Sequence, residues 1–225
     1  MSDADDDYYS EGDYDYDDDF DENEFDDGFG YDDIDEPVKK EPVKDESFNI
    51  PNNYSPSAIQ AIMKEYKTIQ KLSYLDHYFT VEPIGNNIAQ WKIKIFNIPT
   101  DSELFMDMQR RNLDYILVHI TFPPDYPFAP PFIRVINPRF RHMTGHVTVG
   151  GAICTNLLSN EGWNPSYRIS QIIEDIRANF TAGNGRLDLN NTSDYTMYEA
   201  MEALRRLLSS HGWTHWATKQ DKLLH

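Results

Sequence analysis

The sequence predicts an α+β domain, because helical and strand patterns are segregated along the chain instead of alternating. An amphipathic helical repeat follows residue 55, and four short stretches with strand character lie between residues 79 and 136. Two further helical patterns follow residue 168, after a segment with no regular period. We therefore expect an N-terminal helix, a four-stranded antiparallel meander, a long loop and C-terminal helices.

The first helix is expected to begin at Ser55, whose side chain suits the N-cap position, with Pro56 in the first turn. Apolar residues then recur at helical spacing for about five turns. The outer edge of this helix is basic, because Lys64, Lys67 and Lys71 fall between the apolar positions.

Two strands are expected at residues 79–84 and 88–98, joined by a turn at 85–87. In the second of them Trp91, Ile93 and Ile95 share one face, since side chains alternate along a strand. The segment SELFMDMQRRN that follows is polar, and we interpret it as a connection anchored by apolar side chains, namely Leu104, Phe105 and Met106.

A third strand is expected at 115–122 and a fourth at 132–136. Between them the sequence PPDYPFAPP contains five prolines, which fix φ and remove backbone donors, so it forms neither strand nor helix. After the irregular segment 137–168, one helix is expected at 169–180. A second is expected to start near Ser193-Asp194 and to stop at Gly212.

Charge divides the chain into parts. Residues 1–36 hold 19 of the 38 acidic residues and no Lys or Arg, which predicts a disordered acidic tail. We expect a linker at 37–55, a core domain at 56–216 and a C-terminal tail at 217–225. The tail argues against nucleic-acid binding, because phosphate repels it. It is suited either to a basic partner surface or to a solubilising or autoinhibitory role.

Composition also limits the setting of the protein. No run of about 20 apolar residues is present, so we expect no membrane span. The acidic N-terminus is unlike a secretory or mitochondrial signal, and the single cysteine forms no internal disulfide. These features predict a reducing compartment, the cytoplasm or the nucleus, and no metal site is expected.

The single cysteine, Cys154, is either a small buried hydrophobe or a nucleophile, and its residue type alone does not decide. Its neighbourhood favours the second interpretation. Gly150 and Gly151 precede it, and glycines let a backbone approach a ligand closely. Long irregular segments inside compact domains are usually functional.

Three motifs carry a resemblance to the ubiquitin-conjugating enzymes, over about residues 57–181. The family has a Tyr-Pro-Phe-x-Pro-Pro element, a Gly-x-Ile-Cys element around the nucleophile, and a Trp-x-Pro element. The matching residues are Tyr126, Pro127, Phe128, Pro130 and Pro131 for the first, Gly151, Ile153 and Cys154 for the second, and Trp163 and Pro165 for the third.

The chain departs from the family at the tripeptide His-Pro-Asn, which normally precedes the cysteine. Here His146 stands at the position of the Asn, eight residues before Cys154. With the helical part that follows, this pattern resembles the divergent Q class of the family.

The resemblance implies that Cys154 accepts ubiquitin, or a ubiquitin-like modifier, as a thioester from an activating enzyme. The activating enzyme consumes ATP, so no cofactor is expected on this chain. Transfer to a substrate protein then requires donors for an oxyanion, supplied by His146 or by a backbone N–H of Gly150 or Gly151. The alternative for His146 is a structural role, as a bridge within the loop. An acidic residue that helps deprotonate a lysine is poorly matched by Asp188, so the acceptor stays open between a lysine, a ligase cysteine and a hydroxyl.

The resemblance also implies two partner surfaces. Phe128, Pro165 and Ser166 match the loops that meet ubiquitin ligases, with core packing of Phe128 as the alternative. The basic edge of the first helix, Lys64, Lys67 and Lys71, matches the surface that meets the activating enzyme, with a solvated helix face as the alternative.

Three other functions stay open. The first is an inactive variant of the same fold that binds ubiquitin or a ligase as an adaptor, although the cysteine in register argues against it. The second is a conjugating enzyme for a ubiquitin-like modifier. The third is a cysteine hydrolase, for which the downstream histidines His211 and His215 lie in no supporting motif.

Overall fold

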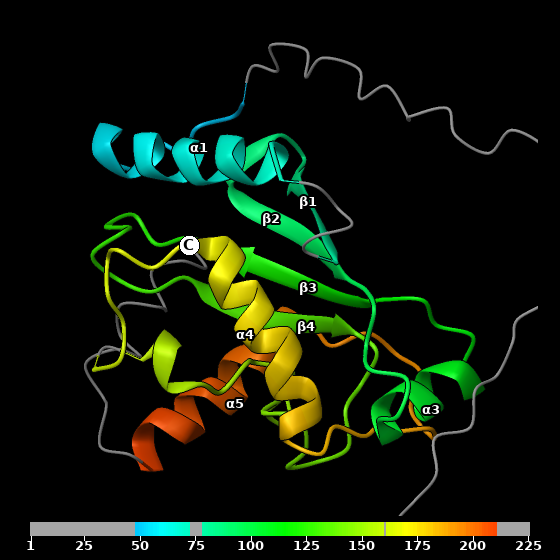
Figure 1. Cartoon of the computed structure of the whole chain (residues 1–225). Helices are drawn as coiled ribbons and strands as arrows, with labels where there is room; N and C mark the ends of the chain where they lie inside the picture. The colour runs from blue at the N-terminus through cyan, green and yellow to red at the C-terminus, as the bar shows by residue number, and fades with distance from the viewer. Residues whose placement is uncertain (1–47, 73–77, 160, 211–225) are drawn as a thin grey trace, which may run out of the picture. The chain divides into compact units, whose positions relative to one another are not determined.

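The computed structural model describes residues 48–72, 78–159 and 161–210, with side chains as far as residue 206 (Figure 1). Four of the expected features lie outside these ranges: the acidic tail at 1–36, most of the linker at 37–55, the helix stop at Gly212 and the C-terminal tail at 217–225. The described part is an α+β fold built on one four-stranded sheet.

The sheet is the expected antiparallel meander. Its strands β1 (Phe79–Ile84), β2 (Asn87–Ile95), β3 (Ile116–Thr121) and β4 (Phe132–Asn137) lie in sequence order. Strand β2 starts one residue earlier than predicted and ends at Ile95 instead of residue 98. The pair Ile93 and Val118 faces each other across β2 and β3, and both side chains are buried on the face that forms the core.

Helix α1 (Pro56–Gln70) begins as expected, because the Ser55 hydroxyl accepts a hydrogen bond from the N–H of Ala58 at 3.1 Å. One side of the helix packs against the sheet through Ile59, Ile62 and Ile69. The amphipathic pattern is therefore confirmed.

The connection between β2 and β3 contains a helix that the sequence interpretation missed, α3 (Glu103–Arg110). The Ser102 hydroxyl caps it by accepting from the N–H of Phe105 at 3.1 Å. Leu104 is fully buried as expected, whereas Met106 is 48% exposed, so its assignment as an anchor was wrong. The helical turn directs Asp107 inward instead.

Asp107 explains why a polar segment folds here. Its carboxylate is fully buried and accepts from Arg186 Nε at 2.7 Å and from the N–H of Leu187 at 3.1 Å. Burial alone raises the pKa of a carboxyl, but these hydrogen bonds from Arg186 and Leu187 outweigh it and hold the pKa of Asp107 below its usual value.

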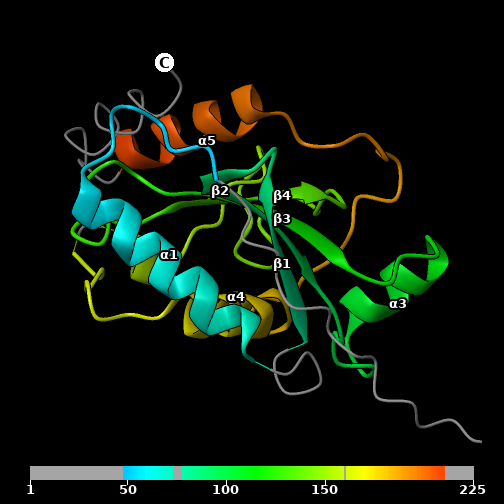
Figure 2. The same cartoon turned by 90° about the horizontal axis from the view of Figure 1, so that it is seen from above.

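Helices α4 (Ile169–Ala182) and α5 (Met197–Ser210) lie on opposite sides of the sheet (Figure 2). Helix α4 joins the main core through Ile172, Ile173 and Ile176. Helix α5 forms a second cluster, in which Met201 and Leu204 pack against Phe132 and Ala152.

Helix α5 begins three residues later than the predicted start at Ser193-Asp194. Thr196 and Glu199 form a reciprocal capping pair: the N–H of Glu199 donates to Thr196 Oγ1 at 3.1 Å, and the N–H of Thr196 donates to Glu199 Oε2 at 2.8 Å. Ser193 and Asp194 belong to the preceding segment, where Ser193 accepts a hydrogen bond from Arg139.

A buried carboxylate on α1 also supports α4. Glu65 accepts from Arg168 Nη1 at 2.8 Å and from the N–H of Ile169 at 3.0 Å. The N–H groups of a first helical turn have no partner inside the helix, so Glu65 caps α4 from a neighbouring helix.

Candidate active site

Cys154 lies at the end of a short backbone extension of the sheet. The N–H of Val135 donates to the carbonyl of Gly151 at 2.8 Å, and the N–H of Ile153 donates to the carbonyl of Ile133 at 3.0 Å. These bonds pair residues 151–153 with β4. The backbone just before the thiol is therefore hydrogen-bonded to the sheet, although the surrounding sequence has no regular period.

His146 adjoins the cysteine through its backbone. The N–H of Cys154 donates to the carbonyl of His146 at 2.9 Å, and His146 adopts a left-handed conformation with φ of 55°. The imidazole is exposed. A Cβ at Gly183 would lie 2.7 Å from His146 Cδ2, so the glycine after α4 leaves room for the ring.

Cys154 is half-buried, and this burial raises the pKa of its thiol. A thiol with a raised pKa yields less thiolate, which is the nucleophilic form. The site therefore protects the resting thiol instead of activating it.

A pocket of about 540 Å³ opens beside Cys154. Residues 142–143 and 146–149 form one wall, and Gly183 at the end of α4 with Ala203 and Arg206 of α5 completes it. Two apolar side chains stand exposed at its edge, Met143 at 83% and Val149 at 58%. Among the described residues that line the pocket, none is Asp or Glu.

The glycine pair before the cysteine packs against α5 and the segment that leads into it. A Cβ at Gly150 would lie 2.0 Å from the carbonyl oxygen of Glu199, and a Cβ at Gly151 would lie 2.7 Å from the ring of Tyr195. The N–H of Gly151 donates to the carbonyl of Thr148 at 2.9 Å, so this N–H is occupied. The suggestion that Gly151 supplies the oxyanion donor is thus disfavoured.

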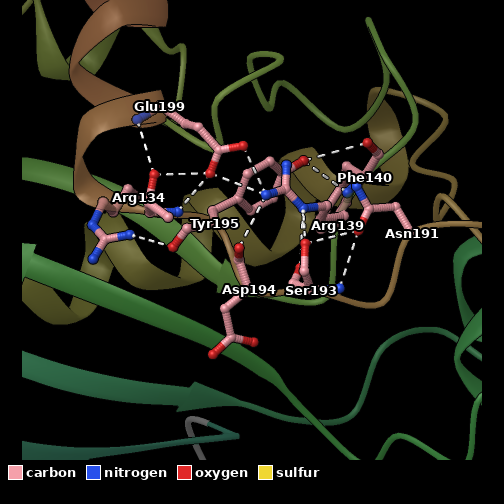
Figure 3. A network of polar contacts seen from close by, with 9 residues as sticks. Arg134, Arg139, Phe140, Asn191, Ser193, Asp194, Tyr195 and Glu199 are labelled. Atoms are coloured by element: carbon pink, nitrogen blue, oxygen red, sulfur yellow. Dashed lines mark hydrogen bonds and ion pairs between the residues drawn. The ribbon is translucent and has the colours of Figure 1, made fainter.

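An arginine fixes the segment that leads into α5 (Figure 3). Arg139 donates from Nη2 to both carboxylate oxygens of Glu199, at 2.8 and 3.0 Å, and from Nε to the carbonyl of Ser193 at 3.0 Å. Its guanidinium lies 4.4 Å from the ring centre of Tyr195, whose hydroxyl accepts from the N–H of Phe140 at 3.0 Å. We call these residues the Arg139 cluster.

The two loops predicted to meet a ligase are joined to each other. Trp163 Nε1 donates to the carbonyl of Pro127 at 2.7 Å. Phe128 is 78% exposed, so the alternative of core packing was wrong. Pro165 and Ser166 are also exposed.

The remaining predicted residues lie apart from the pocket. Lys64, Lys67 and Lys71 are exposed along α1. Asp188 does not line the pocket, and its carboxylate accepts from the N–H of Asn190 at 3.0 Å. The histidines at 211 and 215 lie outside the described residues.

The sequence interpretation missed the contribution of α5 to this site. Ala203 and Arg206 line the pocket, although they lie about 50 residues beyond the cysteine along the chain. The motif Thr-x-x-Glu at 196–199 is a capping signature and would have located the helix start.

Two further findings concern the described residues alone. They contain no group of three or more His, Cys, Asp or Glu side chains arranged to hold a metal ion. No helix among them combines the length and the apolar character that crossing a membrane requires.

Comparison with known proteins gives a consistent result. The family model for the ubiquitin-conjugating enzymes matches residues 61–208. The chain is 34% identical to ubiquitin-conjugating enzyme E2 Q-like protein 1 of Mus musculus over 159 residues, which is 69% of this chain and 96% of that protein. It is 32% identical to ubiquitin-conjugating enzyme E2 Q1 of Homo sapiens over 206 residues, which is 87% of this chain and 48% of that protein.

A third relative is a Q-like ubiquitin-conjugating enzyme of Drosophila melanogaster, the protein CG4502, which is 36% identical over 160 residues. The match covers 70% of this chain and 52% of that protein, so the chain spans about half the length of this relative and of E2 Q1. Among solved structures, a ubiquitin-conjugating enzyme E2 of Plasmodium falciparum matches with a TM-score of 0.42 and 23% identity, covering 55% of this chain and 97% of that one.

Proposed function

The chain belongs to the ubiquitin-conjugating enzyme family, in its Q class, and we propose that it carries ubiquitin as a thioester on Cys154. The observation that carries the proposal is the environment of Cys154. The thiol directly follows a segment that is hydrogen-bonded to β4, is half-buried, and borders an open pocket. A purely structural cysteine requires no such opening.

The first step is an exchange of thioesters. The Cys154 thiolate attacks the carbonyl carbon of ubiquitin on the activating enzyme, the carbon–sulfur bond to that enzyme breaks, and its thiol leaves. Because burial raises the pKa of Cys154, the free protein supplies less thiolate for this step than an exposed thiol would. ATP is consumed upstream, and this chain binds no cofactor in the reaction.

In the second step an acceptor attacks the thioester, and the carbonyl oxygen becomes an oxyanion that needs hydrogen-bond donors. His146 has two roles in this proposal. Its backbone carbonyl fixes the N–H of Cys154, and its exposed imidazole donates a hydrogen bond to the oxyanion. The acceptor is a lysine of a substrate protein or a cysteine of a ligase.

Two surfaces are proposed for partners. The first consists of the joined loops that carry Phe128, Pro165 and Ser166, where a ligase binds; the exposure of Phe128 supports this assignment. The second is the basic edge of α1, where the activating enzyme binds through Lys64, Lys67 and Lys71.

A single-turnover charging reaction tests the proposal. Full-length protein is mixed with ubiquitin, an activating enzyme and ATP, and the products are separated with and without reductant. We expect one reductant-sensitive adduct, absent from Cys154→Ala, and a reductant-resistant oxygen ester on Cys154→Ser. An adduct that persists on Cys154→Ala contradicts the proposal.

A second candidate is an adaptor of the same family that binds ubiquitin or a ligase without carrying it. The raised pKa of the Cys154 thiol favours this candidate. Failure to charge with ubiquitin and with ubiquitin-like modifiers, together with retained binding of a ligase, supports the adaptor. Charging with a ubiquitin-like modifier alone changes the cargo and leaves the role of Cys154 in place.

A further inference from the structure

The pocket beside Cys154 differs in character from the rest of the site, since it combines apolar walls with a positive edge. We propose that it is an acceptor subsite, which binds an apolar side chain next to an acidic residue in the protein that receives ubiquitin. This inference rests on the proposed function of Cys154, and it adds a preference for the sequence around the acceptor.

The apolar part of the proposal comes from the loop and from α5. Met143 and Val149 are exposed at the edge of the pocket, while Val147 and Ala203 lie buried in its wall. Exposed apolar groups of this size mark binding sites when they gather around a concavity. A volume of about 540 Å³ suits a large apolar side chain with part of its backbone.

The polar part of the proposal comes from the unequal pairing of charges on α5. Glu199 is paired with Arg139, and Glu202 with Arg205. Arg206 lines the pocket, is exposed, and has no ion-pair partner within the ranges that the structure describes. An arginine is always cationic, so the pocket edge attracts a carboxylate and repels an ammonium group.

Thr148 also lines the pocket, but its hydroxyl oxygen is covered by protein atoms and offers no donor to a ligand. The preference therefore rests on the apolar walls and the edge cation, which together fit an extended acidic-apolar peptide.

The position of Cys154 on the pocket wall connects binding with transfer. The acyl carbon of the carried ubiquitin is attached to Cys154 Sγ, so residues next to the bound side chain reach that carbon. The acceptor nucleophile adds to the carbonyl, the carbon–sulfur bond breaks, and Cys154 leaves as a thiolate that takes up the proton released by the acceptor. Binding in the pocket thus raises the local concentration of the acceptor.

The test follows discharge of the preformed thioester of the full-length protein onto short peptides. The peptides share one acceptor, lysine in one series and cysteine in another, and differ only in the pair beside it: Leu-Glu, Leu-Lys or Ser-Glu. The lysine of the Leu-Lys pair is trimethylated, so that it keeps its charge but cannot accept ubiquitin. We expect the Leu-Glu peptide to react about fivefold faster than Leu-Lys, because of charge, and about tenfold faster than Ser-Glu, because of the apolar side chain.

Variants assign the preference to the pocket. Arg206→Glu should reverse the order of Leu-Glu and Leu-Lys, while Lys92→Glu, an equal charge reversal on the exposed side of β2, should leave it unchanged. Val149→Ser should reduce the advantage of Leu over Ser. Equal rates for all peptides, or an equal slowing of charging and discharge by Arg206→Glu, overturn the proposal; the latter assigns the pocket to the carried ubiquitin.

A second measurement separates this inference from the proposed function. The uncharged protein is treated with iodoacetamide, with each peptide present in excess. We expect the Leu-Glu peptide to slow alkylation of Cys154 and the Leu-Lys peptide to leave it unchanged. Protection without charging would retain the pocket and reject the thioester, whereas charging without protection or peptide preference would reject the pocket alone.

Discussion

The two sides of the loop that carries Cys154 are built in opposite ways. On the side of α5 the loop is closed, because Gly150 and Gly151 leave no space for even a methyl group. On the side of the pocket it is open, and Met143 and Val149 are largely exposed. One segment of about a dozen residues therefore combines close packing on one side with an open pocket on the other.

The difference indicates that the two sides have separate roles. The closed side fixes the backbone, since Gly150 and Gly151 pack on Glu199 and Tyr195, and the Arg139 cluster and the capping pair of α5 hold these two residues. The open side places a half-buried thiol beside a pocket. A reacting group needs both, because a misplaced thiol reacts slowly and a covered thiol does not react.

The largest loss of stability is expected when a methyl group is added on the closely packed side of the loop. Gly150→Ala would place a Cβ 2.0 Å from the carbonyl of Glu199, so α5 must move. We expect the free energy of unfolding to fall by about 3 kcal/mol, as measured by chemical denaturation. Cys154 should also be alkylated faster, because α5 contributes to the pocket wall.

Two controls belong to this experiment. Gly85→Ala meets no atom within 4 Å but keeps a positive φ of 56°, so only about 1 kcal/mol should be lost. Val149→Ser, on the open side, should change stability by less than about 0.5 kcal/mol. If Gly150→Ala costs no more than Gly85→Ala, the closed side is not rigid.

The next largest effect is expected at His146. Its carbonyl accepts a hydrogen bond from Cys154, and its side chain is exposed beside the pocket. In His146→Gly the backbone keeps its left-handed conformation and its hydrogen bond to Cys154, and only the imidazole is lost. We expect the free energy of unfolding to change by less than about 1 kcal/mol. Discharge of the thioester, measured in single turnover, should slow about a hundredfold.

His146→Asn is the matched variant, because asparagine also tolerates a left-handed conformation and carries a donor. It should retain more of the discharge rate than His146→Gly. Equal rates for the original protein and His146→Gly would assign His146 a structural role alone.

A smaller effect is expected from the capping pair. Glu199→Ala removes the bonds to Arg139 and to Thr196, and the free energy of unfolding should fall by about 1.5 kcal/mol. Glu202→Ala, on the same helix, breaks only a surface pair with Arg205 and should cost about 0.5 kcal/mol or less. Equal losses would show that the Arg139 cluster adds nothing to an ordinary surface pair.

The smallest effect is a pH dependence on the open side. Burial raises the pKa of Cys154, so less thiolate is present at neutral pH than for an exposed thiol. Alkylation of the uncharged protein should therefore be a few-fold slower than that of a free thiol at pH ~7 and should still rise at pH ~9. A rate that levels off below pH ~8 would contradict a raised pKa.

The sequence alone predicted the four strands of the sheet and the two helices, α1 and α4, that pack on the main core. Strand alternation at Trp91, Ile93 and Ile95 and the helical spacing of α1 and α4 reflect burial on one face, which periodicity reports directly. Short motifs singled out Cys154 as the candidate nucleophile, and they indicated that the chain resembles the Q class. These features are encoded over short stretches of chain.

Features that depend on distant partners were not predictable in this way. Helix α3 reads as polar because its buried carboxylate, Asp107, is balanced by Arg186, 79 residues away. The pocket wall required the packing of α5 on Gly150, and the sequence does not reveal which helix fills the space above a glycine. Tertiary contacts overrode local composition at both places.

Glu65 connects the two proposed partner surfaces. Its carboxylate lies on α1, between the exposed lysines Lys64 and Lys67, and holds the start of α4 directly after the loop of Pro165 and Ser166. A protein that shifts α1 and a protein that shifts this loop therefore act on the same pair of hydrogen bonds. If binding at one surface changes these hydrogen bonds, thermodynamic linkage makes its effect on binding at the other surface reciprocal, so this single side chain would couple the two proposed sites.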